Sequence, residues 1–212
     1  MNGRMAEERK GMLLVVSGPA GAGKGTLIER LMQSDPTFVF SVSCTTREMR
    51  YYETNGVQYY FINDEQFDKY IQENAFLEYA TVHGHRYGTL LSEVKERLAK
   101  GINVILDIDV QGGLAVMKKA PDCVSVFIYP PSYQDLLDHL HKRNSEGEEE
   151  IQRRVHNARG EIQKMGEYQY LLLNDDLETA FDHLKCIVTA EKMKSSRFIP
   201  TIPEKRPDHS KN

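Results

Sequence analysis

A glycine-rich segment directly follows an apolar run near the start of the chain, and its residue types suit phosphate binding. It consists of Gly18, Pro19, Ala20, Gly21, Ala22, Gly23, Lys24, Gly25 and Thr26. Because glycine has no Cβ, consecutive backbone N–H groups can turn toward one anion, and the N-terminus of a following helix adds partial positive charge. Lys24 supplies a mobile ammonium that can reach the outer phosphates. The segment predicts a binding loop for a nucleoside triphosphate.

The residue after the lysine departs from the usual form of such loops. Most place Ser or Thr there, where the hydroxyl holds Mg²⁺, but here Gly25 stands at that position and Thr26 follows. With about 3.6 residues per helical turn, the Thr26 hydroxyl points about 100° further round. The order Gly-Lys-Gly-Thr resembles adenylate-kinase-type loops and favours a nucleoside monophosphate kinase. The alternative, a glycine-rich turn without a ligand, does not explain why a strand precedes it and a helix follows.

Length and composition favour one α/β core with room for inserted parts. The chain has 212 residues and a formal net charge of −4, which argues against broad nucleic-acid binding. No apolar run approaches the roughly 18 residues of a membrane span, and residues 1–11 lack the apolar segment of a signal peptide. We therefore expect a cytoplasmic protein that binds neither nucleic acid nor membranes; its oligomeric state stays open.

The three cysteines, Cys44, Cys123 and Cys186, are scattered and include no Cys-x-x-Cys pair. This usage suits a reducing cytosol and argues against a disulfide framework or a zinc site. The apolar neighbours of Cys123 and Cys186 predict that both pack in the core.

Alternating strand and helix patterns predict the fold class. Strands are expected at residues 12–17, 103–109, 123–129 and 170–174, and helices at 26–33, 92–100, 132–142 and 176–190. The strands are almost continuously apolar, as parallel strands covered on both faces must be. We predict an α/β fold with a P-loop NTPase-type parallel sheet and helices on both faces, whose ligands bind at the carboxyl ends of the strands.

Two segments interrupt this alternation. Residues 38–90 are rich in Tyr, Thr and alternating apolar positions, which predicts a small antiparallel insertion, and residues 143–160 are highly charged, which predicts a mobile helical lid. The polar, proline-containing end predicts a flexible tail. The expected division is a core of 1–42, 91–142 and 161–194, an insertion of 43–90, a lid of 143–160 and a tail of 195–212.

The insertion carries side chains suited to a second phosphate. Arg47 and Arg50 lie three residues apart, and guanidinium groups grip phosphate with paired hydrogen bonds. Glu53 can hold one of them in the gripping rotamer. Tyrosine, carboxylate and hydroxyl groups follow at Tyr59, Glu78, Tyr87 and Thr89.

Taken in order, these motifs resemble the guanylate kinase family. The family's arginine-rich run matches residues 43–61, and three later motifs match Leu77-Glu78, Tyr87-Gly88-Thr89 and Leu106 to Gly112; Asn174-Asp175-Asp176 matches a further one. The resemblance spans roughly residues 11–191. It implies ATP-dependent phosphorylation of GMP, and of dGMP, to GDP by direct in-line transfer with Mg²⁺.

The resemblance also implies roles for individual residues. The GMP phosphate would be held by Arg47, Arg50, Tyr59 and Tyr87 with Glu53 orienting the arginines, and guanine would be read by Ser43, Glu78, Thr89 and Asp109. The catalytic charges would be Lys24, Arg143 and Arg154. ATP would be bound by residues 18–26 and by Asn174.

The chemistry of guanine supports this set. N1–H and the exocyclic amine form a two-donor edge that Glu78 can accept, whereas adenine presents a lone pair at N1. A buried acceptor without a donor costs on the order of 1–3 kcal/mol. GMP is therefore expected to be preferred over AMP.

Asp107 and Asp109 end the expected strand on alternate sides. Strand-end capping is one explanation for such a pair. Their place beside the phosphate loop favours a function, and we expect Asp107 to hold waters on Mg²⁺.

Several positions depart from the family pattern. Met49 and Tyr52 replace a frequent proline and glycine, while Asn144 and Val155 replace a frequent glycine and leucine. These changes affect loop stiffness or lid hinging and leave the charges in place. The rival interpretations are a non-catalytic peptide-binding relative, a kinase for another phosphate ester and an adenylate kinase; Lys24 and the guanine-reading set argue against them.

Overall fold

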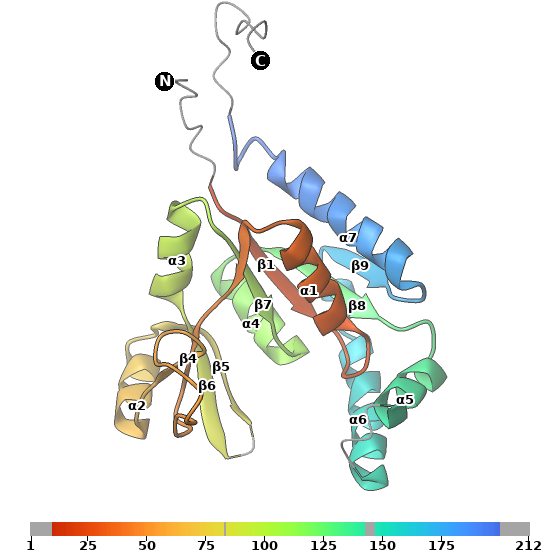
Figure 1. Cartoon of the computed structure of the whole chain (residues 1–212), viewed down its shortest axis with the longest axis horizontal. Helices are drawn as coiled ribbons and strands as arrows, with labels where there is room; N and C mark the ends of the chain where they lie inside the picture. The colour runs from red at the N-terminus through yellow and green to blue at the C-terminus, as the bar shows by residue number, and fades with distance from the viewer. Residues whose placement is uncertain (1–9, 83, 143–146, 200–212) are drawn as a thin grey trace, which may run out of the picture.

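A five-stranded parallel sheet forms the centre of the computed structural model, which describes residues 10–82, 84–142 and 147–199 (Figure 1). Its strand order is β2-β7-β1-β8-β9, and every neighbouring pair is parallel. The strands are β2 (Phe38–Phe40), β7 (Asn103–Asp107), β1 (Leu13–Ser17), β8 (Val124–Tyr129) and β9 (Tyr170–Leu173). The expected parallel α/β sheet is confirmed. Phe38–Phe40 belongs to this sheet, so the Tyr- and Thr-rich composition that begins at residue 38 starts within the core, to which the expected division had assigned residues 1–42.

Helices cover both faces of the central sheet. Helices α1 (Lys24–Ser34) and α7 (Leu177–Lys192) pack against the face that carries Leu14 and Val16. Helices α3 (Leu91–Ala99) and α4 (Val110–Lys119) pack against the other face, where Leu13 and Val15 point. Because successive side chains of β1 enter different cores, Leu13 to Val16 must all be apolar.

A second sheet lies in the inserted segment and has the order β4-β3-β6-β5. Its strands are β3 (Ser43–Thr45), β4 (Tyr59–Phe61), β5 (Phe76–Val82) and β6 (His85–Leu90). Pairs β3–β6 and β5–β6 are antiparallel, but β3 and β4 run parallel, so the sheet is mixed rather than antiparallel as expected. The 13 residues between β3 and β4 allow the chain to return to the starting edge instead of forming a hairpin.

Two helices were not predicted from the sequence. In the insertion, α2 (Asp64–Gln72) is capped by Asn63, whose side chain accepts a hydrogen bond from the Gln66 backbone amide at 2.8 Å. In the core, β7 ends at Asp107, two residues earlier than expected, and Asp109 caps α4 by accepting from the Gly112 amide at 2.7 Å. Two glycines at the start of α4 conceal its helical pattern, since glycine disfavours helix interiors.

Helices α5 (Tyr133–Lys142) and α6 (Glu148–Ile162) extend from the same edge of the central sheet as the second sheet, on the other side of the loop that joins β1 to α1 (Figure 1). Within α6, Ile151 and Ala158 are buried, which gives this charged helix an apolar side. A short 3₁₀ turn (Met165–Glu167) leads on to β9. Residues 143–146, among them Arg143, and residues 200–212 of the expected tail lie outside the described residues.

The cysteines differ in burial. Cys44 and Cys123 are buried, whereas Cys186 is exposed on α7, so the predicted core position of Cys186 is wrong. The buried positions of α7 include Leu184 and Val188; Cys186 lies two residues from each and therefore about 200° round the helix. Among the described residues, no helix is both long and apolar enough to cross a membrane.

Asn103 links three parts of the core and yields a stability prediction. It is 6% exposed; its side-chain oxygen accepts from the Met12 amide and its nitrogen donates to Thr37 Oγ1, both at 2.8 Å. Asn103→Ala leaves the Met12 amide without a partner, so we expect the free energy of unfolding to fall by about 1–3 kcal/mol in urea denaturation. The surface variant Lys118→Gln should change it by less than about 0.5 kcal/mol; equal effects of the two variants would contradict this account.

Candidate active site

The loop between β1 and α1 requires glycine at specific positions. Gly18, Gly21 and Gly23 have φ angles of 147°, 90° and 83°, which favour glycine. A Cβ on Gly18 would lie 2.0 Å from the backbone carbonyl oxygen of Ile128. A Cβ on Gly23 would lie 2.2 Å from the side-chain nitrogen Nδ2 of Asn174. The loop therefore passes so close to its neighbours that larger residues are excluded.

Two side chains from distant parts of the chain brace this loop. The Asn174 amide, just after β9, donates to the carbonyl of Ala22 at 2.8 Å. His139 of α5 places Nδ1 3.2 Å from the carbonyl oxygen of Gly21. Sequence reasoning assigned Asn174 to ATP, which stays a prediction, and missed His139, because a histidine in an amphipathic helix has no distinguishing pattern.

Lys24 is the first residue of α1, and its ammonium folds back over the loop. It donates to the carbonyls of Gly18 at 2.7 Å and Pro19 at 3.3 Å. Although Asp107 is exposed at the end of β7, the surrounding protein partly desolvates its carboxyl and raises its pKa, and the charge of Lys24 lowers it in part. Burial likewise raises the pKa of Glu161, near the end of α6, with Lys24 again opposing. The ammonium thus lies close to two carboxyl groups, of which the sequence had indicated only Asp107.

Gly25, in contrast, has no steric reason to be glycine. A Cβ at this position would have no atom within 4 Å, and its φ is not positive. Gly25 and Thr26 are both exposed on the first turn of α1. The missing hydroxyl is therefore a property of the sequence that the fold does not impose.

The second sheet aligns four polar side chains in one row across its strands. Ser43 is opposite Tyr59 on β4, and Glu78 on β5 is opposite Thr89 on β6. The β3–β6 register places Ser43 beside Thr89, with their hydroxyl oxygens 3.4 Å apart. Since residues two apart share a face of a strand, Tyr87 points to the same side as Thr89. The register explains why these separated residues come together.

Glu78 and Thr89 form the partly buried end of this row. The Thr89 hydroxyl donates to Glu78 Oε1 at 2.6 Å. Burial raises the pKa of the Glu78 carboxyl; the hydrogen bond from Thr89 opposes the shift, and the nearby charge of Asp109 adds to it. Glu78 is therefore a partly desolvated hydrogen-bond acceptor, and the negative charge of Asp109 from the core acts on it.

Arg47 and Glu53 form a two-pronged ion pair beside the other end of the row. The Arg47 nitrogens lie 3.0 and 2.7 Å from the two carboxylate oxygens of Glu53, whose side chain is only 5% exposed. Glu53 also accepts from the backbone amide of Arg50 at 2.7 Å. The hydrogen bond from Arg47 lowers the pKa of Glu53 and raises that of Arg47, so both stay charged at neutral pH.

Arg50 and two tyrosines complete the basic cluster. The Arg50 guanidinium donates to the hydroxyl of Tyr52 at 2.7 Å. The rings of Tyr59 and Tyr87 meet edge to face with centroids 5.7 Å apart, and the Arg47 guanidinium lies 5.7 Å from the Tyr59 ring. Tyr52, one of the departures from the family pattern, is thus in direct contact with a predicted phosphate ligand.

The charge of Asp109 acts on carboxyl groups in both halves of the site. It raises the pKa of Glu78 in the second sheet and also that of Glu161 in α6. Arg154 lies half-buried in α6, and Arg143 is outside the described residues. In Figure 1, the phosphate loop lies between the second sheet and α5–α6. This arrangement places the glycine-rich loop on one side and the row of polar side chains of the second sheet on the other.

Comparison with known proteins identifies the architecture. Residues 10–191 match the family model described as guanylate kinase. The chain belongs to the guanylate kinase family. The match confirms the resemblance inferred from the motifs, and it makes the protein a kinase.

Individual guanylate kinases are similar over most of their length. The guanylate kinase of Carboxydothermus hydrogenoformans is 50% identical over 188 residues, covering 89% of this chain and 92% of the relative. That of Thermotoga maritima is 44% identical over 188 residues, or 89% and 91%. The crystal structure of guanylate kinase from Anaplasma phagocytophilum superposes with a TM-score of 0.65 at 31% identity, covering 91% and 92% of the two chains.

The raised pKa of Glu78 predicts how its replacement affects stability. An ionised Glu78 is less favourable in the folded than in the unfolded chain, so it lowers the free energy of unfolding at neutral pH, and this penalty disappears as pH falls below the usual carboxyl range. Glu78→Gln removes the penalty and keeps an acceptor for Thr89. We expect the variant to be at least as stable as the parent at pH 7, with the difference vanishing near pH 4, about the ordinary pKa of Glu.

Urea unfolding at a series of pH values measures this difference. If Glu78→Gln lowered the free energy of unfolding at pH 7 by more than about 1 kcal/mol, the size of an average destabilising mutation, the charge of Glu78 would stabilise the fold.

Proposed function

We propose that this kinase transfers the terminal phosphoryl group of ATP to GMP, and to dGMP, giving GDP or dGDP. The observation that supports this most directly is the row in which Thr89, Ser43 and Tyr59 align with the desolvated carboxylate of Glu78. A carboxylate in this setting matches the adjacent N1–H and exocyclic amine of guanine. The proposed contacts involve the base and the phosphate, so loss of the ribose 2′-hydroxyl should be tolerated.

The acceptor phosphate would be bound by the basic cluster. Glu53 fixes the Arg47 guanidinium in place before any ligand arrives, which reduces the entropy lost on binding. Arg50, Tyr59 and Tyr87 would complete this phosphate site. Binding of the acceptor at a fixed position then aligns its phosphate oxygen with the donor.

The donor would lie on the phosphate loop, with Asn174 close to its base. In-line phosphoryl transfer requires positioning and neutralisation of charge and no covalent intermediate. Lys24 would move from the loop carbonyls to the outer phosphates, and Arg154 and Arg143 would supply further positive charge as α6 approaches. Closure over both nucleotides would exclude water, the competing acceptor.

The residues beside Lys24 fit an Mg²⁺ ion carried by ATP. Within the described parts of the chain no group of three or more His, Cys, Asp or Glu side chains is arranged to hold a metal. Mg²⁺ does not need one, because it keeps several waters and takes one or two carboxylates plus substrate phosphates. Asp107 would hold such waters, and the ion would neutralise phosphate charge. ATP and GMP as substrates suit a cytoplasmic enzyme.

A panel of acceptors tests the proposed function. ADP formation from ATP is measured with GMP, dGMP, AMP, UMP and no acceptor. We expect turnover with GMP and dGMP and little with AMP, since the N1 lone pair of adenine would face the Glu78 carboxylate. Glu78→Gln should lower the ratio of kcat/KM for GMP to that for AMP by about tenfold or more, the effect of one buried unpaired acceptor.

Lys24→Met serves as the control for this panel. It should abolish turnover while GMP binding, measured by calorimetry, persists, because Lys24 belongs to the donor half. Turnover with AMP but not GMP, or unchanged selectivity in Glu78→Gln, would overturn the assignment of the base site.

Gly25→Ser restores the hydroxyl that most phosphate loops carry. The new side chain meets no atom within 4 Å, so it should be accommodated and should stabilise α1 by about 0.5 kcal/mol relative to glycine. We expect the Mg²⁺ concentration for half-maximal activity to fall severalfold, measured by titration at fixed ATP.

Gly25→Ala is the matched control, because it makes the same backbone change without a hydroxyl. If Ser and Ala shift the Mg²⁺ requirement equally, the hydroxyl does not contact the ion or its waters.

A further inference from the structure

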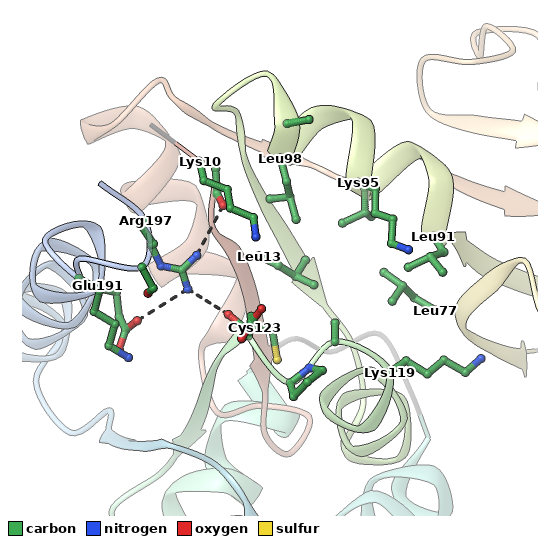
Figure 2. Close-up of a pocket in the computed structure, with 18 of the residues that line it drawn as sticks. Lys10, Leu13, Leu77, Leu91, Lys95, Leu98, Lys119, Cys123, Glu191 and Arg197 are labelled. Atoms are coloured by element: carbon green, nitrogen blue, oxygen red, sulfur yellow. Dashed lines mark hydrogen bonds and ion pairs between the residues drawn. The ribbon is translucent and has the colours of Figure 1, made fainter. Parts of the chain in front are cut away.

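A cavity of about 470 Å³ lies at the edge of the central sheet opposite the phosphate loop (Figure 2). It is lined by the start of β1, the segment just before β8, one side of α3 and the C-terminal ends of α4 and α7, and Leu77 of β5 completes the wall. Cavities of about 300–1,000 Å³ hold drug-sized ligands. The proposed phosphoryl transfer uses none of the residues that line it.

The walls of the cavity are aliphatic. Leu13, Leu77, Val94 and Cys123 are buried side chains of one hydrophobic cluster, and Leu98 packs against it. The described lining residues include no Phe, Tyr or Trp, so a planar base would find no ring on which to stack. The walls therefore suit a saturated hydrocarbon chain.

The rim of the cavity is positively charged. Its lining includes five cationic and two anionic side chains, namely Lys10, Lys95, Lys119, Lys194 and Arg197 against Asp122 and Glu191. Five minus two leaves a formal charge of +3, in a chain whose net charge is −4. This local reversal of sign predicts an anionic ligand.

Two of these lysines are available to a ligand. The carboxylate of Glu191 forms ion pairs with Lys194 at 2.7 Å and with Arg197 at 3.8 Å, so these two cations are already paired. The ammonium groups of Lys10 and Lys95 form no ion pair with any residue in the described part of the chain. Figure 2 shows Leu98 between Lys10 and Lys95, so in this view the free charges flank an apolar surface.

Other cations fix the walls. Arg197 donates to the carbonyl of Asp122 at 3.0 Å, and its Nε is buried without a hydrogen-bond partner among the described residues. Lys119 donates to the backbone carbonyl of Phe76 at 2.7 Å, and this hydrogen bond joins the end of α4 to the first residue of β5. The cavity is thus bounded by side chains that are themselves held in place.

We propose that this cavity is a second ligand site, which takes a small amphipathic anion with an unbranched aliphatic chain and a terminal carboxylate or phosphate. The chain lies against Leu13, Leu77 and Leu98, and the anionic group meets Lys10 and Lys95. The ligand class differs from both nucleotides of the proposed reaction.

The site is connected to the base-reading row through the backbone. Leu77 in the cavity wall directly precedes Glu78, and α3, which forms another wall, follows β6 without a linker. An occupant therefore contacts the segments that carry the second sheet. We expect it to change KM for GMP more than kcat, a readout that rests on the proposed function.

Calorimetry on the full chain tests the site without any turnover. The probes are decanoate, decyl phosphate, decanol and inorganic phosphate, each below its micelle or solubility limit. We expect one equivalent of decanoate or decyl phosphate to bind, affinity to fall with added salt, and each methylene removed to cost up to about fourfold in affinity. Comparison of the two anions shows which head group is preferred.

Variants locate the binding. Replacing both Lys10 and Lys95 with Gln should weaken decanoate about three- to tenfold, as expected for partly exposed charges, whereas Lys118→Gln, on α4 outside the cavity, should not. Ala99→Leu places extra atoms into the cavity from an exposed helix position and should weaken the longer chains most.

No binding of either anion, equal binding of decanol, or binding unchanged in both the lysine and the Ala99→Leu variants overturns the proposal. Binding with KM for GMP unchanged keeps the site and refutes its coupling to the second sheet. A failure of GMP turnover alone bears on the proposed function and not on this site.

Discussion

The site depends on the common direction of the strands in the central sheet. Val16 of β1 pairs with Asp107 of β7, Ser17 pairs with Phe127 of β8, and the parallel ladder continues to β9. Because every strand ends at the same edge, the phosphate loop, the two acids after β7 and Asn174 after β9 arrive there from separate parts of the chain. One antiparallel pair in this sheet would send at least one of these groups to the opposite edge.

The row of polar side chains proposed to read the acceptor depends on a different constraint, the register of a small mixed sheet. A shift of one residue in a strand turns its side chains to the other face, so the contact of Thr89 with Glu78 exists only in the observed pairing. This sheet has its own small apolar cluster, in which Phe67 and Phe76 stack 4.6 Å apart. Because Cys44 of β3 and Phe76 of β5 both belong to this cluster, its packing favours the observed register.

The sequence predicted the long apolar strands well, because burial on both faces leaves a pattern that needs no neighbours to interpret. Motif order predicted which residues gather in each half of the site, although not how. Three features were missed: the parallel pairing of β3 with β4, the helix α4 that Asp109 caps, and the contact of His139 with the phosphate loop. The pairing and the His139 contact join distant segments, and glycines conceal the pattern of α4. Cys186 was misplaced because apolar neighbours in sequence do not share one side of a helix.

The exposure of Cys186 has a practical consequence. The chain contains three cysteines, all free thiols, and two of them are buried, so a thiol-reactive dye would attach to the native protein at one position. That position is on α7, a 16-residue helix packed against the central sheet, away from the second sheet and α6. It is a fixed reference point on the core, from which movements of the two flanking parts can be followed by fluorescence without removing a native residue.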